Sequence, residues 1–216
     1  SQLELHFNQP LVPLRSLASF TFLPTLAMDS VWSFSAGRSV GISLTRPAQP
    51  SSVYLVKATS LMRCVGDPVG FELSIVLAEA AEKGDLILNE VLVDPRTSDP
   101  KFVEIHNTSK KYVSLQNWAL ASLDKLGSLT QIRIIGGAGD LIAPLDFVAL
   151  TSDPDRLRKS YLQSREGNFL QMASLPSMPI DAGLVLLLSP DRQVVDSLPY
   201  RADWHHPLLR STKGVS

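Results

Sequence analysis

The stretch DLILNEVLVDPRTSDPKFVEIHNTSKKYVSLQNWALAS, residues 85–122, decides the fold class of this chain. It contains three successive strand-like runs, separated by turn-forming clusters of Pro, Asp, Ser, Thr, Asn and Lys, at residues 86–93, 102–106 and 112–115. In the second run Val103 and Ile105 alternate with Glu104 and His106, which is the period-two pattern of a strand with one buried face. The stretch therefore predicts consecutive β-strands rather than a helix.

The rest of the C-terminal part is expected to continue this pattern of short strands. The segments predicted as strands are 130–135, 140–142, 147–151, and a hairpin of 183–189 and 193–200 that turns at Pro190 and Asp191. The glycines of 136–139 are predicted to form a turn, because they match no phosphate-binding order and no helix follows them. Residues 168–179 are expected to cross the domain irregularly.

One short helix interrupts the strands. Asp153 and Pro154 supply a capping side chain and a first helical residue, and Leu157 with Tyr161 forms an i, i+4 apolar pair. The period-two pattern ends there, so a helix is predicted over residues 154–162.

The first 78 residues show the same short-strand pattern. Leu3, Leu5 and Phe7 alternate with polar residues, and further strands are expected at 19–23, 30–35, 39–44, 52–59 and 71–77. Because Pro, Gly and Ser separate these strands and no helical stretch intervenes, a small β-sandwich is predicted. The small, charged segment 79–84 is expected to link it to a second domain over residues 85–216.

Several motifs of the second part resemble those of a known family. The motifs are LNEV at 88–91, FVEIHN at 102–107, VSL at 113–115, WAL at 118–120, PLDFVAL at 144–150 and WHHPLL at 204–209. In this order they resemble a lamin-tail domain, with an ending similar to that of its bacterial members. The resemblance implies an immunoglobulin-like β-sandwich that binds or scaffolds and does not catalyse. It also implies an exported or surface-attached bacterial protein with other modules beside this one.

The first part is similar to bacterial Ig-like domains of surface-layer and adhesin-type proteins. The resemblance is borne by LELHFNQPL at 3–11, VYLV at 53–56 and the turn RCVGDP at 63–68, with departures from the usual motifs at Gln9 and Asp67. Such domains normally begin one strand earlier, which suggests an N-terminal truncation. The chain is therefore expected to be all-β, with two tandem Ig-like β-sandwich domains of which the second has one short helix.

Charge and composition narrow the possible functions. Twenty Lys and Arg against 21 Asp and Glu give a net charge of -1, so no global field attracts nucleic acid or an anionic membrane. No apolar run approaches the roughly 18 residues of a membrane span. The single cysteine, Cys64, excludes an intrachain disulfide and is expected to be a buried thiol. The chain opens and ends without natural tails and is interpreted as a piece of a longer protein, so missing targeting signals do not identify its compartment.

Glu90 and Glu104 are the first candidates for chemistry, because a charge inside a strand is costly unless it is paired or hydrogen-bonded. If they face each other across adjacent strands, they have the arrangement to share a proton or hold a cation. The favoured alternative is structural, with Glu104 accepting hydrogen bonds from the backbone or from Asn89 and Asn107. Glu90, Glu104 and Asn107 are accordingly expected to be structural polar residues.

Two segments contain residue types that bind metals. Asp203, His205 and His206, with His106 as a fourth member, are zinc-ligand types, but adjacent histidines on an extended chain point to opposite sides. Loop 94–101 has acids and carbonyls for weak calcium binding, yet it lacks the order of an EF-hand, and a plain Asp-Pro turn is favoured. No metal site and no cofactor are expected.

The predicted partner surface combines the first long loop with the helix. Its residues are Asp94, Arg96, Asp99, Arg156, Arg158 and Lys159. Loops bear function more often than the scaffold does, and with Arg165 the helix holds the densest basic cluster, for which a solvated helix face is the alternative. No nucleophile motif of a known hydrolase is present, so catalysis is not expected.

The predicted function is a non-catalytic structural, adhesive or protein-interaction segment of a larger exported bacterial surface protein. The alternative is an accessory module that binds glycan or nucleic acid for a neighbouring hydrolase domain. Expected partners are other domains of the same polypeptide and an extracellular protein or glycan, with nucleic acid less favoured. The expected location is extracellular or at the bacterial cell surface.

Overall fold

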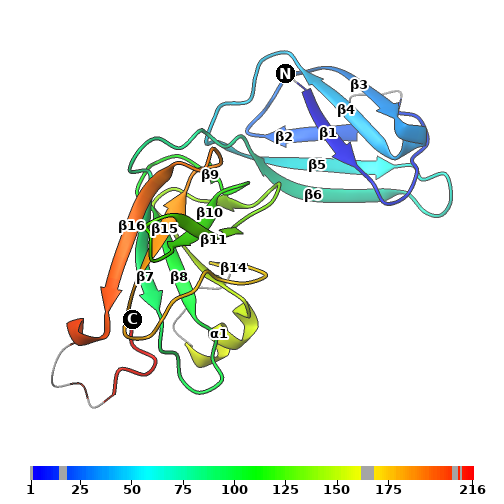
Figure 1. The fold of residues 1–216 in the computed structure, drawn as a ribbon. Helices are drawn as coiled ribbons and strands as arrows, with labels where there is room; N and C mark the ends of the chain where they lie inside the picture. The colour runs from blue at the N-terminus through cyan, green and yellow to red at the C-terminus, as the bar shows by residue number, and fades with distance from the viewer. Residues whose placement is uncertain (1, 15–18, 162–167, 206–208, 210) are drawn as a thin grey trace. The chain divides into compact units, whose positions relative to one another are not determined.

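The computed structural model describes residues 2–14, 19–161, 168–205, 209 and 211–216. The predicted helix end at Leu162, the basic residue Arg165 and the His206, Pro207 and Leu208 of the last motif lie outside the described residues. The chain divides into two compact units, Ser1–Leu77 and Ala78–Ser216 (Figure 1).

The first unit consists of two three-stranded antiparallel sheets, with strand orders β1-β4-β3 and β2-β5-β6. Its elements are β1 Gln2–His6, β2 Phe20–Leu23, β3 Met28–Phe34, the 3-10 turn η2 Ser35–Gly37, β4 Ser39–Leu44, β5 Val53–Leu61 and β6 Val69–Val76. In β5 every second residue from Tyr54 to Ala58 is buried, and these side chains pack with Val40 and Ile42 of β4. The two sheets thus enclose a sandwich core.

The second unit consists of two four-stranded sheets and a two-stranded ribbon. The strand orders are β14-β13-β8-β7, β11-β10-β15-β16 and β12-β9. The elements are β7 Leu86–Leu92, β8 Phe102–Asn107, β9 Val113–Ser114, β10 Ala119–Leu123, β11 Leu129–Ile134, β12 Leu141–Ile142, β13 Phe147–Thr151, α1 Pro154–Ser160, β14 Phe169–Gln171, β15 Ala182–Leu188, β16 Val194–Arg201 and the 3-10 turn η3 Ala202–Trp204.

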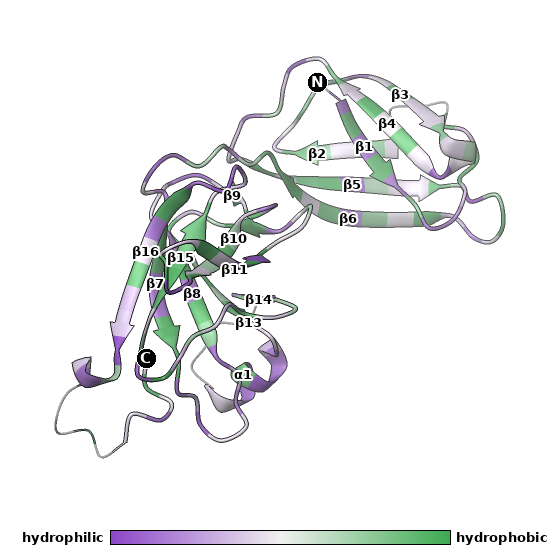
Figure 2. Ribbon diagram, viewed as in Figure 1, coloured by the Kyte–Doolittle hydropathy of each residue, from purple (hydrophilic) through white to green (hydrophobic). Residues whose placement is uncertain are grey.

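The core of the second unit lies between its two four-stranded sheets. Val103 and Ile105 of β8 are fully buried and belong to one cluster with Leu120 of β10 and Leu187 of β15. Figure 2 shows the hydrophobic residues concentrated along strands such as β8 and β15. The expected fold class, an all-β chain of two Ig-like β-sandwich units with one short helix, is confirmed.

Helix α1 begins where the capping pattern predicts. The Asp153 carboxylate accepts a hydrogen bond from the backbone N–H of Arg156 at 3.0 Å, and Pro154 occupies the first turn. Leu157 is buried among Leu92, Phe102 and Ala149, with Tyr161 packed beside them. The helix therefore covers one end of the outer face of the β7–β8 sheet.

Two sequence-based expectations are wrong. The region 168–179 is not wholly irregular, since β14 pairs in parallel with β13 and the backbone N–H of Ala149 donates to the Asn168 carbonyl at 2.9 Å. Cys64 is exposed, because the chain turns directly after Leu61, whose side chain is the one that enters the core. The segment 79–84 lies with the second unit, where Glu79 forms a parallel bridge with Val113.

Candidate functional site

The predicted partner surface is built from the β7–β8 loop and helix α1, which the structure joins through Asp99. The Asp99 carboxylate accepts a hydrogen bond from the Ser160 hydroxyl at 2.8 Å, and Arg156 Nε lies 3.8 Å from the same oxygen. The Asp99 side chain is only 9% exposed, whereas that of Arg156 is 50% exposed. The Asp99 carboxylate therefore fixes the loop to the helix from within, and the Arg156 side chain is accessible to a partner.

Tyr161, which caps α1, fixes Arg96 at the same surface. The Arg96 guanidinium lies over the Tyr161 ring, 5.6 Å from its centroid, and Phe102 packs edge-on against that ring at 6.5 Å. Burial raises the pKa of Tyr161, although the nearby Arg96 charge opposes this shift. A cation over a partly buried ring gains cation–π attraction, so the orientation of Arg96 is defined.

The segment 212–216 returns to this surface. The backbone N–H of Gly214 donates to the Asp94 carbonyl at 2.8 Å, and the Tyr161 hydroxyl donates to the Gly214 carbonyl at 3.2 Å. Gly214 has φ of 74°, and a Cβ there would lie 2.7 Å from the Cγ of Arg96. Only glycine combines this backbone conformation with such close contact to Arg96.

The remaining cations of the helix differ in their surroundings. Arg158 lies 3.3 Å from the carboxylate of Asp155 and over the ring of Phe169 at 5.4 Å, whereas Lys159 is exposed in the last turn. The structure thus brings all six predicted residues to one region, with Asp99 inward and Arg96, Arg156 and Lys159 as its positive charges. This region of mixed charge therefore contains the residues of the partner surface predicted from the sequence.

Glu90 and Glu104 are directly opposite each other in the register of β7 and β8. The Asn89 side chain donates to a Glu104 carboxylate oxygen at 2.7 Å, and the Ser216 hydroxyl contacts Glu90. Burial raises the pKa of Glu104, the Asn89 bond lowers it, and the Glu90 charge raises it further. The two acids do face each other, and of the two asparagines named as donors Asn89 is the one bonded to Glu104.

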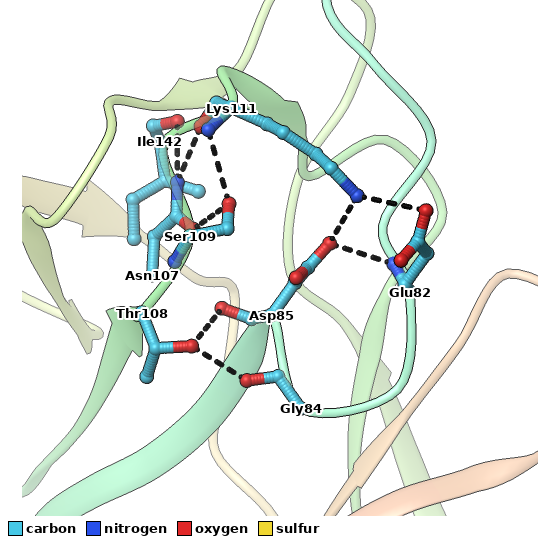
Figure 3. Close-up of polar contacts among 8 residues, drawn as sticks. All are labelled: Glu82, Gly84, Asp85, Asn107, Thr108, Ser109, Lys111 and Ile142. Atoms are coloured by element: carbon cyan, nitrogen blue, oxygen red, sulfur yellow. Dashed lines mark hydrogen bonds and ion pairs between the residues drawn. The ribbon is translucent and has the colours of Figure 1, made fainter.

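Asn107 is instead the centre of a separate buried network (Figure 3). Its side-chain amide donates to the carbonyls of Lys111 at 2.7 Å and Ala143 at 2.8 Å, and its oxygen accepts from the hydroxyl of Ser109 at 2.7 Å. The residue is completely buried at the end of β8. This network ties the loop that follows β8 to the end of β12.

An ion cluster lies beside that network. The ammonium of Lys111 is 2.9 Å from the carboxylate of Asp85 and 3.1 Å from that of Glu82 (Figure 3). The backbone N–H of Glu82 donates to Asp85 at 2.8 Å, and this bond is the main reason why the pKa of Asp85 is lowered. The start of the second unit is therefore tied to the loop after β8.

The candidate metal ligands do not converge. Asp203 forms a two-bond pair with Arg201 at 2.9 and 2.6 Å, and His106 stacks on Phe147 at 4.1 Å. Among the residues that the structure describes, no three His, Cys, Asp or Glu side chains form a cluster able to hold a metal ion. In loop 94–101 Asp99 is already engaged by Ser160 and Arg156, which favours a structural role for its carboxylate.

Two contributors to the surface were not identified from the sequence. Ser160 and Gly214 make the contacts that join α1 and the segment 212–216 to the β7–β8 loop. A serine near a helix end and a glycine near a chain end are common, and their partners are distant in sequence. No local pattern indicates such contacts.

One comparison with known proteins, the match to a family model, agrees with the fold. The family model of the Lamin Tail Domain matches residues 79–202, which is more than half of the chain. No curated protein matches significantly. Among solved structures, the chain is similar to a DUF4876 family protein from Bacteroides thetaiotaomicron VPI-5482, with 13% identity, a TM-score of 0.32, 87% of this chain covered and 66% of that one. The chain thus spans slightly less than two thirds of that protein. By the match over residues 79–202, this chain belongs to the lamin tail domain family.

Proposed function

We propose that this chain is a non-catalytic structural and protein-interaction segment of a larger exported bacterial surface protein. Its first unit is proposed to be a bacterial Ig-like domain of the surface-layer or adhesin type. The observation that supports an interaction role is the anchoring of the β7–β8 loop to helix α1 through Asp99, Ser160 and Arg156.

This anchoring matters because a binding surface that is already ordered loses less conformational entropy when a partner docks. Arg96 is held by Tyr161, Arg156 by Asp99, and Lys159 projects from the last helical turn. These three cations suit a protein partner with an acidic patch. The neighbouring acid Asp155 pairs with Arg158 and reduces the local positive field, which disfavours the denser phosphates of nucleic acid.

The surroundings of the candidate catalytic side chains support a non-catalytic role. Glu104 is bonded to Asn89, Asp203 to Arg201, and His106 is stacked on Phe147. Each of these groups already has a structural partner, and members of the lamin tail domain family have a non-enzymatic fold.

No helix among the described residues is long and apolar enough to span a membrane.

Charge reversal of the helix tests this proposal. The variant Arg156→Glu, Arg158→Glu, Lys159→Glu is compared with the matched control Lys83→Glu, Lys110→Glu, Lys125→Glu, whose three side chains are also exposed in the second unit. Purified bacterial surface proteins, oligonucleotides and glycans serve as immobilised probes. We expect a surface-protein partner whose affinity falls in the helix variant and at higher salt, and persists in the control.

Two results would contradict the proposal. One is binding of surface proteins that is equal in both triple variants and independent of salt. The other is metal-dependent turnover of generic esterase, phosphatase, nuclease or glycosidase substrates that is lost in Glu104→Gln. Preferential binding of oligonucleotides would favour the accessory role for a neighbouring hydrolase instead.

A further inference from the structure

A pocket of about 490 Å³ lies in the second unit between β7, the end of β16 and the segment 212–216. Among its lining residues are Asn89, Glu90, Arg201, Trp204, His205 and Ser216. Its volume falls within the range of small-molecule binding sites. The partner-surface cations Arg156 and Lys159 are not among the described residues that line it.

Trp204 gives the pocket an exposed aromatic surface. The side chain belongs to η3, directly after β16, and is 62% exposed. Tryptophan is highly buried on average, because its indole gains the most from leaving water. An indole held at the edge of a pocket offers an apolar face for stacking and one N–H donor.

Oriented polar groups line the same pocket. The Asn89 amide is held by its bond to Glu104 at 2.7 Å, and Arg201 is held in a planar two-bond pair with Asp203 at 2.9 and 2.6 Å. This pairing raises the pKa of Arg201 and lowers that of Asp203, so both groups stay charged near neutral pH. Fixed planar groups of this kind impose direction on the hydrogen bonds of a ligand.

The lining side chains carry no excess positive charge. Glu90 contributes a carboxylate, and the guanidinium of Arg201 is already paired with the carboxylate of Asp203. The pocket therefore provides no excess positive charge to hold a phosphate or sulfate group. A neutral ligand with hydrogen-bond donors for Glu90 therefore fits these groups better than an anionic one.

We propose that this pocket binds a neutral saccharide. A sugar ring has an apolar C–H face that stacks on an indole, and hydroxyl groups that both donate and accept hydrogen bonds. Those hydroxyls can donate to the carboxylate of Glu90 and accept from the guanidinium of Arg201. They can do both with the amide of Asn89, which has a donor and an acceptor. The pocket borders the partner surface through the segment 212–216, but this proposal does not rest on the function proposed for that surface.

A proline-rich peptide is the main competing ligand, because such peptides also stack on aromatic side chains. Proline has no backbone N–H, so a proline-rich segment offers few donors to the carboxylate of Glu90. The Ser216 hydroxyl contacts Oε1 of Glu90, and covering Oε2 without giving it a donor would cost binding free energy. The acid in the pocket therefore favours the saccharide.

Calorimetric titration of the full chain with cellotetraose, chitotetraose, xylotetraose, mannotetraose and deca-L-proline tests the proposal. We expect one or more of the tetrasaccharides to bind, with affinity about tenfold lower in Trp204→Ala and largely restored in Trp204→Phe. Glu90→Gln and Asn89→Ala should each weaken binding several-fold. Leu126→Ala, which removes an exposed side chain outside the pocket, is the control and should bind like the wild type.

The proposal is overturned if none of the four sugars binds at millimolar concentration, if Trp204→Ala binds as well as the wild type, or if deca-L-proline binds more tightly than every sugar. Because Trp204 is exposed, thermal unfolding should show that its variants remain folded. The helix charge-reversal variant should retain sugar binding in full. Loss of sugar binding and loss of protein-partner binding would thus be distinguished.

Discussion

Glu90 and Glu104 stand directly opposite each other on the antiparallel strands β7 and β8, and each carboxylate has its own hydrogen-bonding neighbour. Asn89 donates to Glu104 and the Ser216 hydroxyl contacts Glu90. Like charges in this cross-strand position repel each other, and partial burial adds a desolvation penalty. The two neighbours orient the carboxylates but leave the repulsion in place.

We predict that Glu104→Gln slightly stabilises the protein at neutral pH. Burial and then Glu90 raise the folded-state pKa of Glu104 above its usual 4.5, so its contribution to stability is full below the unfolded pKa and is lost as pH rises through the folded pKa. Glutamine does not titrate and keeps an oxygen for Asn89. The free energy of unfolding should rise by about 0.5 kcal/mol at neutral pH.

Urea denaturation across the acid range measures this effect. The advantage of Glu104→Gln should shrink as pH falls, because the wild-type side chain then becomes protonated. Glu104→Ala should cost about 1 kcal/mol, the low end for a lost acceptor, since Asn89 is exposed and can bond to water. The repulsion would be contradicted if the stability of Glu104→Gln relative to wild type were lower at neutral pH than in acid.

Asn107 should be far more sensitive to substitution than either glutamate. Asn107→Ala removes a completely buried side chain and leaves the carbonyls of Lys111 and Ala143 without their donor, at a cost of about 2 to 4 kcal/mol. Asn107→Asp should cost more at neutral pH, because a carboxylate would face those carbonyls. Thermal unfolding measures both variants, with the exposed Gln116→Ala as the control. Equal melting temperatures for the Asn107 variants and wild type would contradict the role of this network.

The sequence predicts most strands because their burial alternates. Strand β8 was found from Val103 and Ile105, and both are fully buried. Strand β10 gives no such signal, since Ala119, Leu120 and Ala121 are all fully buried and both faces of the strand are covered. The three residues of β14 pair with β13 only in the folded chain, so their conformation is set by tertiary contacts and not by a local pattern.

The charged residues of the candidate site could be predicted from the sequence, but the hydrogen bonds that join its segments could not. Loop composition and the basic helix identify both halves of the partner surface. The bond between Ser160 and Asp99 spans 61 positions in sequence, and the bond from Gly214 to Asp94 spans a longer distance. Side-chain chemistry alone cannot choose between the many serines and aspartates that could form such a pair. The exposure of Trp204 is likewise decided by packing around η3.

Asp85 should stabilise the second unit at neutral pH. The N–H of Glu82 and the ammonium of Lys111 lower its folded-state pKa below the usual 3.8, so its contribution is present above the unfolded pKa and is lost as pH falls through the folded value. Asp85→Asn should lower the free energy of unfolding by about 1 kcal/mol, after allowance for solvent screening.

Chemical denaturation at neutral and acidic pH measures the Asp85 contribution. The difference between Asp85→Asn and wild type should disappear in strong acid, where the wild-type carboxyl is also neutral. Glu82→Gln is a suitable control, because that side chain is 81% exposed and should change stability much less. A constant difference at all pH values would show that the charge of Asp85 is not responsible.

Tyr200 offers a different test, because its hydroxyl is buried against the backbone of Gly183. Among the described residues the hydroxyl has no hydrogen-bond partner, and a Cβ added to Gly183 would lie 2.2 Å from its oxygen. A buried hydroxyl without a partner costs free energy. Tyr200→Phe should therefore keep the ring packing and leave stability unchanged or raise it by about 1 kcal/mol at neutral pH.

The pH dependence of the same variant gives the sharper result. Burial raises the pKa of Tyr200 to about 12, so its contribution to stability is full below the usual 10.0 and is lost as pH rises towards 12. Tyr200→Phe should lose less stability than wild type when the pH is raised above 10, as measured by urea denaturation. Gly183→Ala should destabilise by about 2 kcal/mol through overpacking against the ring, and Tyr200→Phe should relieve only part of this, because two ring carbons also lie within 3 Å of the added methyl position. Full additivity of the two changes would mean that Gly183 and Tyr200 do not share this contact.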